Sequence, residues 1–242
     1  MGIDCTRPCQ DIYRSCSRWG EEGRCNYGKG RGRTLWFDDN CAETCQSCQS
    51  DERIKLPVPF PPLLEQLSWL VGEWQTKTSS SSRYPIDTLG PYDENVIFQQ
   101  SNITMFDRPA LNFTAIAKVT GDDSDVHYDV GFVTSKLVVE DTGFDNDDKA
   151  VRDDVGLELN SNTGINTVEE GLLEGQTITL RTTWKKAIPP MENRLFKSAR
   201  RTFKALSHNQ LEEKTIITMK DGEVKSFTKY FYRIKDLLSP SN

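Results

Sequence analysis

Near its C-terminal end the sequence contains the stretch Val224-Lys-Ser-Phe-Thr-Lys-Tyr-Phe-Tyr-Arg-Ile234. Its side chains fall into two sets that alternate along the chain. Successive side chains of an extended strand point to opposite faces, so alternate residues share a face. One set is Phe227, Lys229 and Phe231, and the other is Thr228, Tyr230 and Tyr232. The pattern predicts a long β-strand with one face turned toward a core.

Shorter β-patterned runs precede this strand and are separated by turn-forming residues. The runs are Asn95 to Gln99, Leu111 to Val119, Tyr128 to Val133, Thr163 to Glu169, Thr177 to Trp184, Arg201 to Ala205 and Lys214 to Met219. Turn signals stand at Gly121, Gly175, Asn209 and Asp221-Gly222, the last typical of a two-residue hairpin. No long helical pattern interrupts them. Because closure removes exposed strand edges, we predict a mainly β protein, a closed antiparallel up-and-down β-barrel of about ten strands.

A small N-terminal module is predicted from the cysteines. All seven lie between Cys5 and Cys48, and none follows. A zinc site would favour CxxC pairs and histidine, but there is one CxxC and both histidines lie far downstream. A disulfide framework fits better and implies an oxidising compartment, although no apolar leader precedes Cys5.

The joint between the two parts is rich in proline. Prolines at 57, 59, 61 and 62 favour an extended spacer over a helix or a central strand. We therefore divide the chain into a disulfide module at 5–48, a linker at 49–62 and a barrel at 63–238. The apolar positions of Leu63 to Leu70 predict one or two helical turns laid over one end of the barrel.

Composition excludes several classes of function. The formal charge of the 242 residues is −6, and residues 1–50 carry seven basic and seven acidic side chains, so the excess negative charge lies in the barrel. An acidic barrel is a poor partner for nucleic acid. No apolar run reaches the roughly 18 residues of a membrane span. The absence of GxSxG and HExxH motifs, and of a cysteine near a histidine, argues against an enzyme.

The cysteine module resembles the ShK-toxin-like (ShKT) domain, a small secreted module. The resemblance rests on Cys9-x-Asp11-x4-Cys16-x2-Trp19-x3-Gly23-x-Cys25 and on Asn40-Cys41-x2-Thr44-Cys45-x2-Cys48. Spacing alone leaves fifteen pairings open for six cysteines. The resemblance implies the pairs Cys9–Cys48, Cys16–Cys41 and Cys25–Cys45, leaves Cys5 over, and implies an interaction domain with an extracellular protein partner.

The rest of the chain, from about residue 63 to 236, resembles the nitrobindin family of lipocalin- and fatty-acid-binding-protein-like barrels. The similar segments are Leu67-Ser-Trp-Leu-Val-Gly72-Glu-Trp74, Tyr84-Pro85, Tyr92-x-Glu94, Ala110-Leu-Asn-Phe113, Gly131-Phe132, Val168-Glu-Glu-Gly171 and Tyr230-Phe-Tyr232. The resemblance implies a haem-binding barrel whose iron is ligated by a histidine on the last strand.

Two departures bear on haem. Phe227 stands where the resemblance places the iron-ligating histidine, and Gln75 to Ser82 replaces a glycine-rich stretch that would let the backbone approach a flat ligand. Lys229, on the same face as Phe227, is a poor ligand because its amine must first lose a proton. We interpret His127 and His208 as solvated turn residues.

These observations predict a secreted, non-enzymatic binding protein whose barrel holds a small, lipid-like hydrophobic ligand. The expected cavity residues are Phe227, Lys229, Trp74, Phe113 and Phe132, with no metal and no cofactor. In one alternative the barrel binds haem through a different iron ligand and carries out nitric oxide or peroxynitrite-isomerase-type chemistry. Another makes the barrel a scaffold for the ShKT-like module.

Two glycosylation sequons are present, Asn102-Ile-Thr104 and Asn112-Phe-Thr114. A chain of this composition contains about two such motifs by chance, so they establish nothing alone. They permit N-glycosylation if the chain is secreted.

Overall fold

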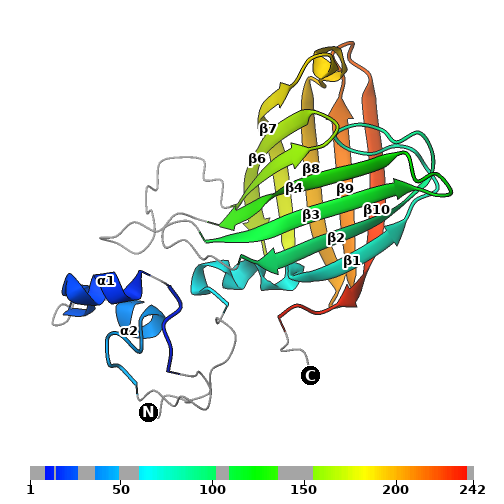
Figure 1. The fold of residues 1–242 in the computed structure, drawn as a ribbon. Coiled ribbons are helices and arrows are strands. Elements are labelled where there is room, and N and C mark those ends of the chain that lie inside the picture. The colour runs from blue at the N-terminus through cyan, green and yellow to red at the C-terminus, as the bar shows by residue number, and fades with distance from the viewer. Residues whose placement is uncertain are drawn as a thin grey trace.

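The computed structural model describes residues 9–13, 15–26, 36–48, 60–101, 109–135 and 155–238. Ten strands and the short helix η2 (Pro62–Leu70) form the larger part (Figure 1). The strands are β1 (Gly72–Lys77), β2 (Tyr92–Gln100), β3 (Ala110–Val119), β4 (Val126–Ser135), β5 (Val155–Ser161), β6 (Ile165–Glu174), β7 (Thr177–Ala187), β8 (Ser198–Ser207), β9 (Gln210–Thr218) and β10 (Val224–Lys235), with a further 3-10 turn, η3 (Met191–Arg194). No helix among the described residues is long and apolar enough to cross a membrane.

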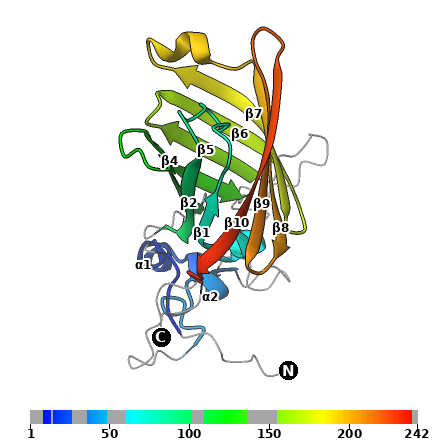
Figure 2. The same ribbon diagram turned by 90° about the vertical axis from the view of Figure 1, so that its right-hand side faces the viewer.

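The strands form one closed antiparallel barrel in which each strand pairs with its neighbour in sequence and β1 pairs with β10 (Figures 1 and 2). The predicted closed up-and-down barrel is therefore confirmed. β10 alternates as expected, since Lys229 and Phe231 are buried while Tyr230 and Tyr232 are exposed. Left-handed glycines occupy the predicted turns at Gly121, Gly175 and Gly222.

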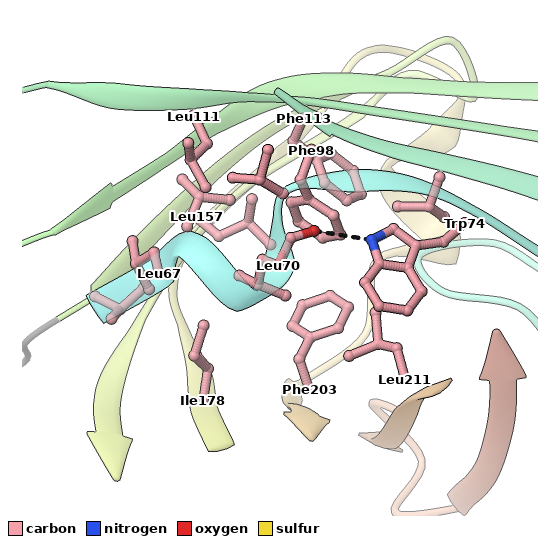
Figure 3. Packing of buried hydrophobic residues seen from close by; sticks show 14 of the residues in the cluster. Leu67, Leu70, Trp74, Phe98, Leu111, Phe113, Leu157, Ile178, Phe203 and Leu211 are labelled. Carbon is pink, nitrogen blue, oxygen red and sulfur yellow. Dashed lines mark hydrogen bonds between the residues drawn. The ribbon is translucent and has the colours of Figure 1, made fainter. Parts of the chain in front are cut away.

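One end of the barrel is closed by η2, as the apolar pattern of Leu63 to Leu70 predicted. Leu64, Leu67 and Leu70 are fully buried in the apolar cluster inside the barrel. Figure 3 shows Leu67 and Leu70 packed among side chains from the strands. The Trp74 indole Nε1 donates a hydrogen bond to the Leu70 carbonyl oxygen at 2.8 Å, which ties the end of η2 to β1. Each fully buried leucine contributes about 1.5–3 kcal/mol of apolar burial, so η2 acts as an apolar plug.

The N-terminal module is held by three disulfides and a small core. Cys9–Cys48, Cys16–Cys41 and Cys25–Cys45 are the pairs that the ShKT resemblance implied. They join Cys9, α1 (Cys16–Glu21) and η1 (Arg24–Asn26) to the segment 41–48 that follows α2 (Trp36–Asn40). Trp19 packs edge-on against Tyr13 and Phe37. Each disulfide stabilises a module with so small a core by about 2–4 kcal/mol. The assignment of this module to the ShKT domain stays a prediction.

We expect a chain beginning near Leu63 to fold without the module. The buried residues of both apolar clusters of the barrel begin at Leu64, with only the partly buried Phe60 before them, and residues 49–59 lie outside the described residues. Circular dichroism should give one cooperative thermal transition at the temperature of the barrel transition in the full chain. A non-cooperative melt would place the boundary elsewhere.

Candidate ligand site and the charged interior

A layer of charged side chains separates two apolar clusters inside the barrel. On β10 the inward positions run from Phe231 in the cluster under η2, through Lys229, to Phe227, which packs against the second cluster. On β8 the same order is Phe203, Arg201, Ala199. The second cluster consists of Tyr84, Ile165, Ala187, Phe196, Ala199 and Ile217. Charged groups therefore occupy the middle of the barrel.

These groups form a continuous chain of opposite charges. In order, the chain is Asp129, Arg83, Glu94, Lys229, Glu213, Arg201 and Glu169. The Lys229 ammonium lies 2.8 Å from Glu94 Oε2 and 2.8 Å from Glu213 Oε2. All seven side chains are at most 6% exposed. Buried charges of this kind must remain paired, because removing one partner leaves the other without solvation.

The connection between β1 and β2 brings two side chains into the barrel, Arg83 of the charged chain and Tyr84 of the second apolar cluster. Arg83 Nη2 donates to Asp129 Oδ2 at 2.6 Å and to Glu94 Oε1 at 3.0 Å. The next residue, Tyr84, places its ring 4.5 Å from the Arg201 guanidinium and packs against Phe196. A segment outside the strands therefore helps to fill the interior.

The protonation states follow from these contacts. Burial alone would raise the pKa of Glu94, but Lys229 and Arg83 outweigh it and lower that pKa to about 2. Burial alone would lower the pKa of Lys229, but the Glu213 and Glu94 carboxylates outweigh this effect and raise that pKa. For Glu169, burial dominates over Arg201 and raises the pKa. At neutral pH Lys229 is therefore a protonated, fully engaged cation.

A side pocket opens where β1 separates from β10. The two strands pair only at Glu73, Trp74 and Gln75, opposite Lys235, Arg233 and Tyr232. The pocket beyond these pairs has a volume of about 580 Å³. It is lined by Gln75, Thr76, Lys77, Thr78, Ser79, Ser80 and Ser82 on one side and by Phe227, Thr228, Lys229, Tyr230, Tyr232 and Ile234 of β10 on the other. Its walls combine hydroxyl groups with an aromatic and aliphatic strip, and its size is that of a small-molecule site.

The structure brings together only part of the predicted cavity. Phe227 and Lys229 line the side pocket, whereas Trp74 and Phe113 are packed in the apolar cluster under η2. The prediction for Phe132 is wrong. Its side chain is 48% exposed on the outer face of β4, because its neighbours Gly131 and Val133 take the inward positions.

One of the two histidine interpretations is also wrong. His127 is buried, and its Nε2 lies 3.1 Å from Asp125 Oδ1. Burial, with Arg83 nearby, lowers the pKa of His127. His208 is an exposed residue of the β8–β9 turn, as predicted. Neither histidine lines the side pocket.

The side pocket has no histidine that could ligate a haem iron. Phe227 presents a phenyl ring, and the Lys229 amine is protonated and bonded to two carboxylates. Tyr230 and Tyr232 project from the outer face of β10, opposite to Phe227. The lining residues therefore offer no imidazole for iron, and the second lining amine, that of Lys77, is exposed and lies 3.8 Å from Asp93 Oδ1.

The barrel sequence matches a family model described as the THAP4-like, heme-binding beta-barrel domain, over residues 63–232. The chain belongs to this family. In this THAP4-like barrel the side pocket presents Phe227, and its lining residues include no histidine.

Relatives of the THAP4-like barrel differ in how much of this chain they share. "Uncharacterized protein C28H8.5" of Caenorhabditis elegans is 24% identical over 221 residues, covering 87% of this chain and 67% of that protein. "Peroxynitrite isomerase THAP4" of Homo sapiens is 26% identical over 144 residues, which is 54% of this chain and 22% of that protein. The crystal structure of Rv2717c from M. tuberculosis has a TM-score of 0.51 at 17% identity and covers 72% of this chain and 98% of that one. The last similarity concerns the fold alone.

Proposed function

We propose that the chain is a non-enzymatic binding protein that holds a small, lipid-like ligand in the side pocket between β1 and β10. The observation that carries this proposal is the pocket wall itself, where the half-buried Phe227 faces a row of serine and threonine hydroxyls. Such a wall suits a ligand with an apolar body and a hydrogen-bond acceptor at one end.

The charged interior supports a ligand at the side of the barrel. The central layer of buried ion pairs fills the space between the two apolar clusters, so an apolar ligand placed there would break pairs that have no access to water. The side pocket meets this layer only at Lys229, whose charge is already balanced by Glu94 and Glu213. A neutral or weakly polar ligand there leaves the ion pairs intact.

Haem remains the second candidate ligand because of family membership. The human and bovine relatives carry the name "Peroxynitrite isomerase THAP4". In this chain that chemistry would need an iron ligand other than Phe227 or Lys229, so we place it second to lipid-like binding.

We further propose that the protein is secreted and that the cysteine module binds an extracellular protein. The three disulfides of the module support this, because crosslinks of this kind form and persist in oxidising compartments. Recovery of the protein from culture medium of its own cells, with all three pairs intact, is the measurement that checks it.

The pocket is tested by titration with cis-parinaric acid, a fluorescent fatty acid. Phe227→Ala should weaken binding by about tenfold, the loss expected for roughly half of a phenyl group's burial. Ser80→Trp should weaken it as well, since Ser80 is an exposed lining residue and the indole would fill the pocket without touching the core.

The matched control is Phe132→Ala, the same substitution on the outer face, which should leave binding unchanged. Thermal melts of all three variants establish that each is folded during the titration. Unchanged affinity in both pocket variants would show that the fatty acid binds elsewhere.

A further inference from the structure

The sequon Asn112-Phe-Thr114 lies in the first half of β3, and its three residues are divided between the two faces of the barrel. Phe113 is buried in the cluster under η2, so Asn112 and Thr114 occupy the outward positions of the strand. Both outward residues are partly accessible, in contrast to the buried Leu111 and Phe113 on either side of Asn112. The Asn112 amide is therefore presented on the outside of the barrel. The other sequon, at Asn102, lies outside the described residues.

An exposed aromatic ring stands directly beside this asparagine. Asn112 pairs with Phe132 of β4 on one side and with Gln99 of β2 on the other. Directly opposed residues on one face of an antiparallel pair have Cβ atoms about 4.5–5.5 Å apart. Phe132 is 48% exposed, so about half of its surface is open to solvent, on the strand directly paired with Asn112.

We propose that Asn112 is an N-glycosylation acceptor and that the Phe132 ring packs against the first sugar of the glycan. The proposal rests on the secretion proposed above, because the modification takes place in the secretory pathway. The donor is a lipid-linked oligosaccharide diphosphate. Asn112 Nδ2 forms a bond to the anomeric carbon, the bond from that carbon to the diphosphate breaks, the lipid diphosphate leaves, and the amide loses one proton.

The neighbouring ring gives the attached sugar a defined resting place. The face of an aromatic ring carries negative partial charge, and the C–H groups of a pyranose face carry positive partial charge. A sugar on Asn112 is attached to the residue directly paired with Phe132, on the same outward face of the sheet. Packing there would cover an apolar surface that otherwise contacts water.

Acceptor function is tested on the full chain, secreted from eukaryotic cells behind a cleavable leader. Peptide mass spectrometry after treatment with peptide-N-glycosidase should show the diagnostic conversion of residue 112 to aspartate. Thr114→Ala, which keeps Asn112 but destroys the motif, should abolish the modification at 112, and Thr114→Ser should retain it. Protein recovered from the medium with Asn112 unmodified would overturn the proposal.

The role of Phe132 is tested by a double-mutant cycle on thermal stability. The glycan should raise the melting temperature of the wild type relative to Thr114→Ala by about 2 °C, and should give no increase when Phe132 is alanine. Equal stabilisation on both backgrounds would exclude the packing. Titration of Thr114→Ala with cis-parinaric acid distinguishes the glycosylation proposal from the proposed ligand binding. Binding in the side pocket should be unaffected by loss of the glycan.

Discussion

Glu94→Gln should lower the free energy of unfolding by about 3–5 kcal/mol at neutral pH, the usual cost of removing one partner from a buried ion pair. The carboxylate accepts hydrogen bonds from Lys229 at 2.8 Å and from Arg83 at 3.0 Å, in a side chain that is 2% exposed. Glutamine keeps the shape but removes the charge. Two buried cations then lose a counter-ion that water cannot replace.

The matched control is Glu169→Gln, the same substitution in the same charged layer. Burial raises the pKa of Glu169, so its charged form is a cost to the fold at neutral pH. Arg201 also keeps a second carboxylate, that of Glu213. We therefore expect little loss of stability, or a small gain, from this variant. Equal losses in the two variants would show that packing, and not charge, governs the layer.

The pH dependence separates the two carboxylates further. The folded pKa of Glu94 lies below its unfolded value, so its contribution is present above about pH 4.5 and is lost as the pH falls toward 2. The difference between wild type and Glu94→Gln should accordingly shrink over this range. Urea denaturation at several pH values measures it. A difference independent of pH would contradict the assignment.

Alternation of side chains was sufficient to predict the barrel but not every strand. Most strands carry several β-branched or aromatic residues between clear turns, which is why seven short runs and β10 could be located. β5 (Val155–Ser161) was missed because it is short and follows an acidic stretch, Asp145 to Asp154, that has the composition of a loop. β1 (Gly72–Lys77) was also not predicted as a strand, and its first residues, Gly72 to Trp74, were noted only for their similarity to the family.

The charged layer could not be assembled from sequence because its members meet across the barrel. Glu94 and Lys229 are separated by 135 positions, and their contact depends on closure between β1 and β10. A signal was nevertheless present. Lys229 lies between Phe227 and Phe231, and Arg201 between Ala199 and Phe203, so each is a charge at an inward position of an apolar face.

The error at Phe132 has a related cause. Gly131 and Phe132 entered the prediction together as family-like residues, but adjacent strand residues cannot both face inward. The inward residue is Gly131, where a side chain would collide with the backbone of Glu158. Assigning the face of β4 from its neighbours His127, Asp129 and Val133, all buried, would have placed Phe132 outside.

Phe227→His should convert the side pocket into a histidine-ligated haem site. Phe227 already lines the pocket that β1 and β10 leave between them, so an imidazole there would face a space of about 580 Å³. Coordination by a neutral imidazole adds to the affinity gained by burying the porphyrin. We expect haem affinity to rise by about tenfold or more, while affinity for metal-free protoporphyrin IX stays unchanged because it has no iron to ligate.

The control is Phe132→His, which places the same imidazole on the outer face and should leave haem binding as in the wild type. Absorption titrations with haemin, read at the Soret band, compare the three proteins, and protoporphyrin fluorescence supplies the metal-free comparison. A stable histidine-ligated spectrum in the wild type would contradict the inference that Phe227 removes the iron ligand. His127→Ala and His208→Ala would then show which histidine binds the iron, and loss of the spectrum in the first would mean that the buried His127 imidazole exchanges its contact with Asp125 for the iron.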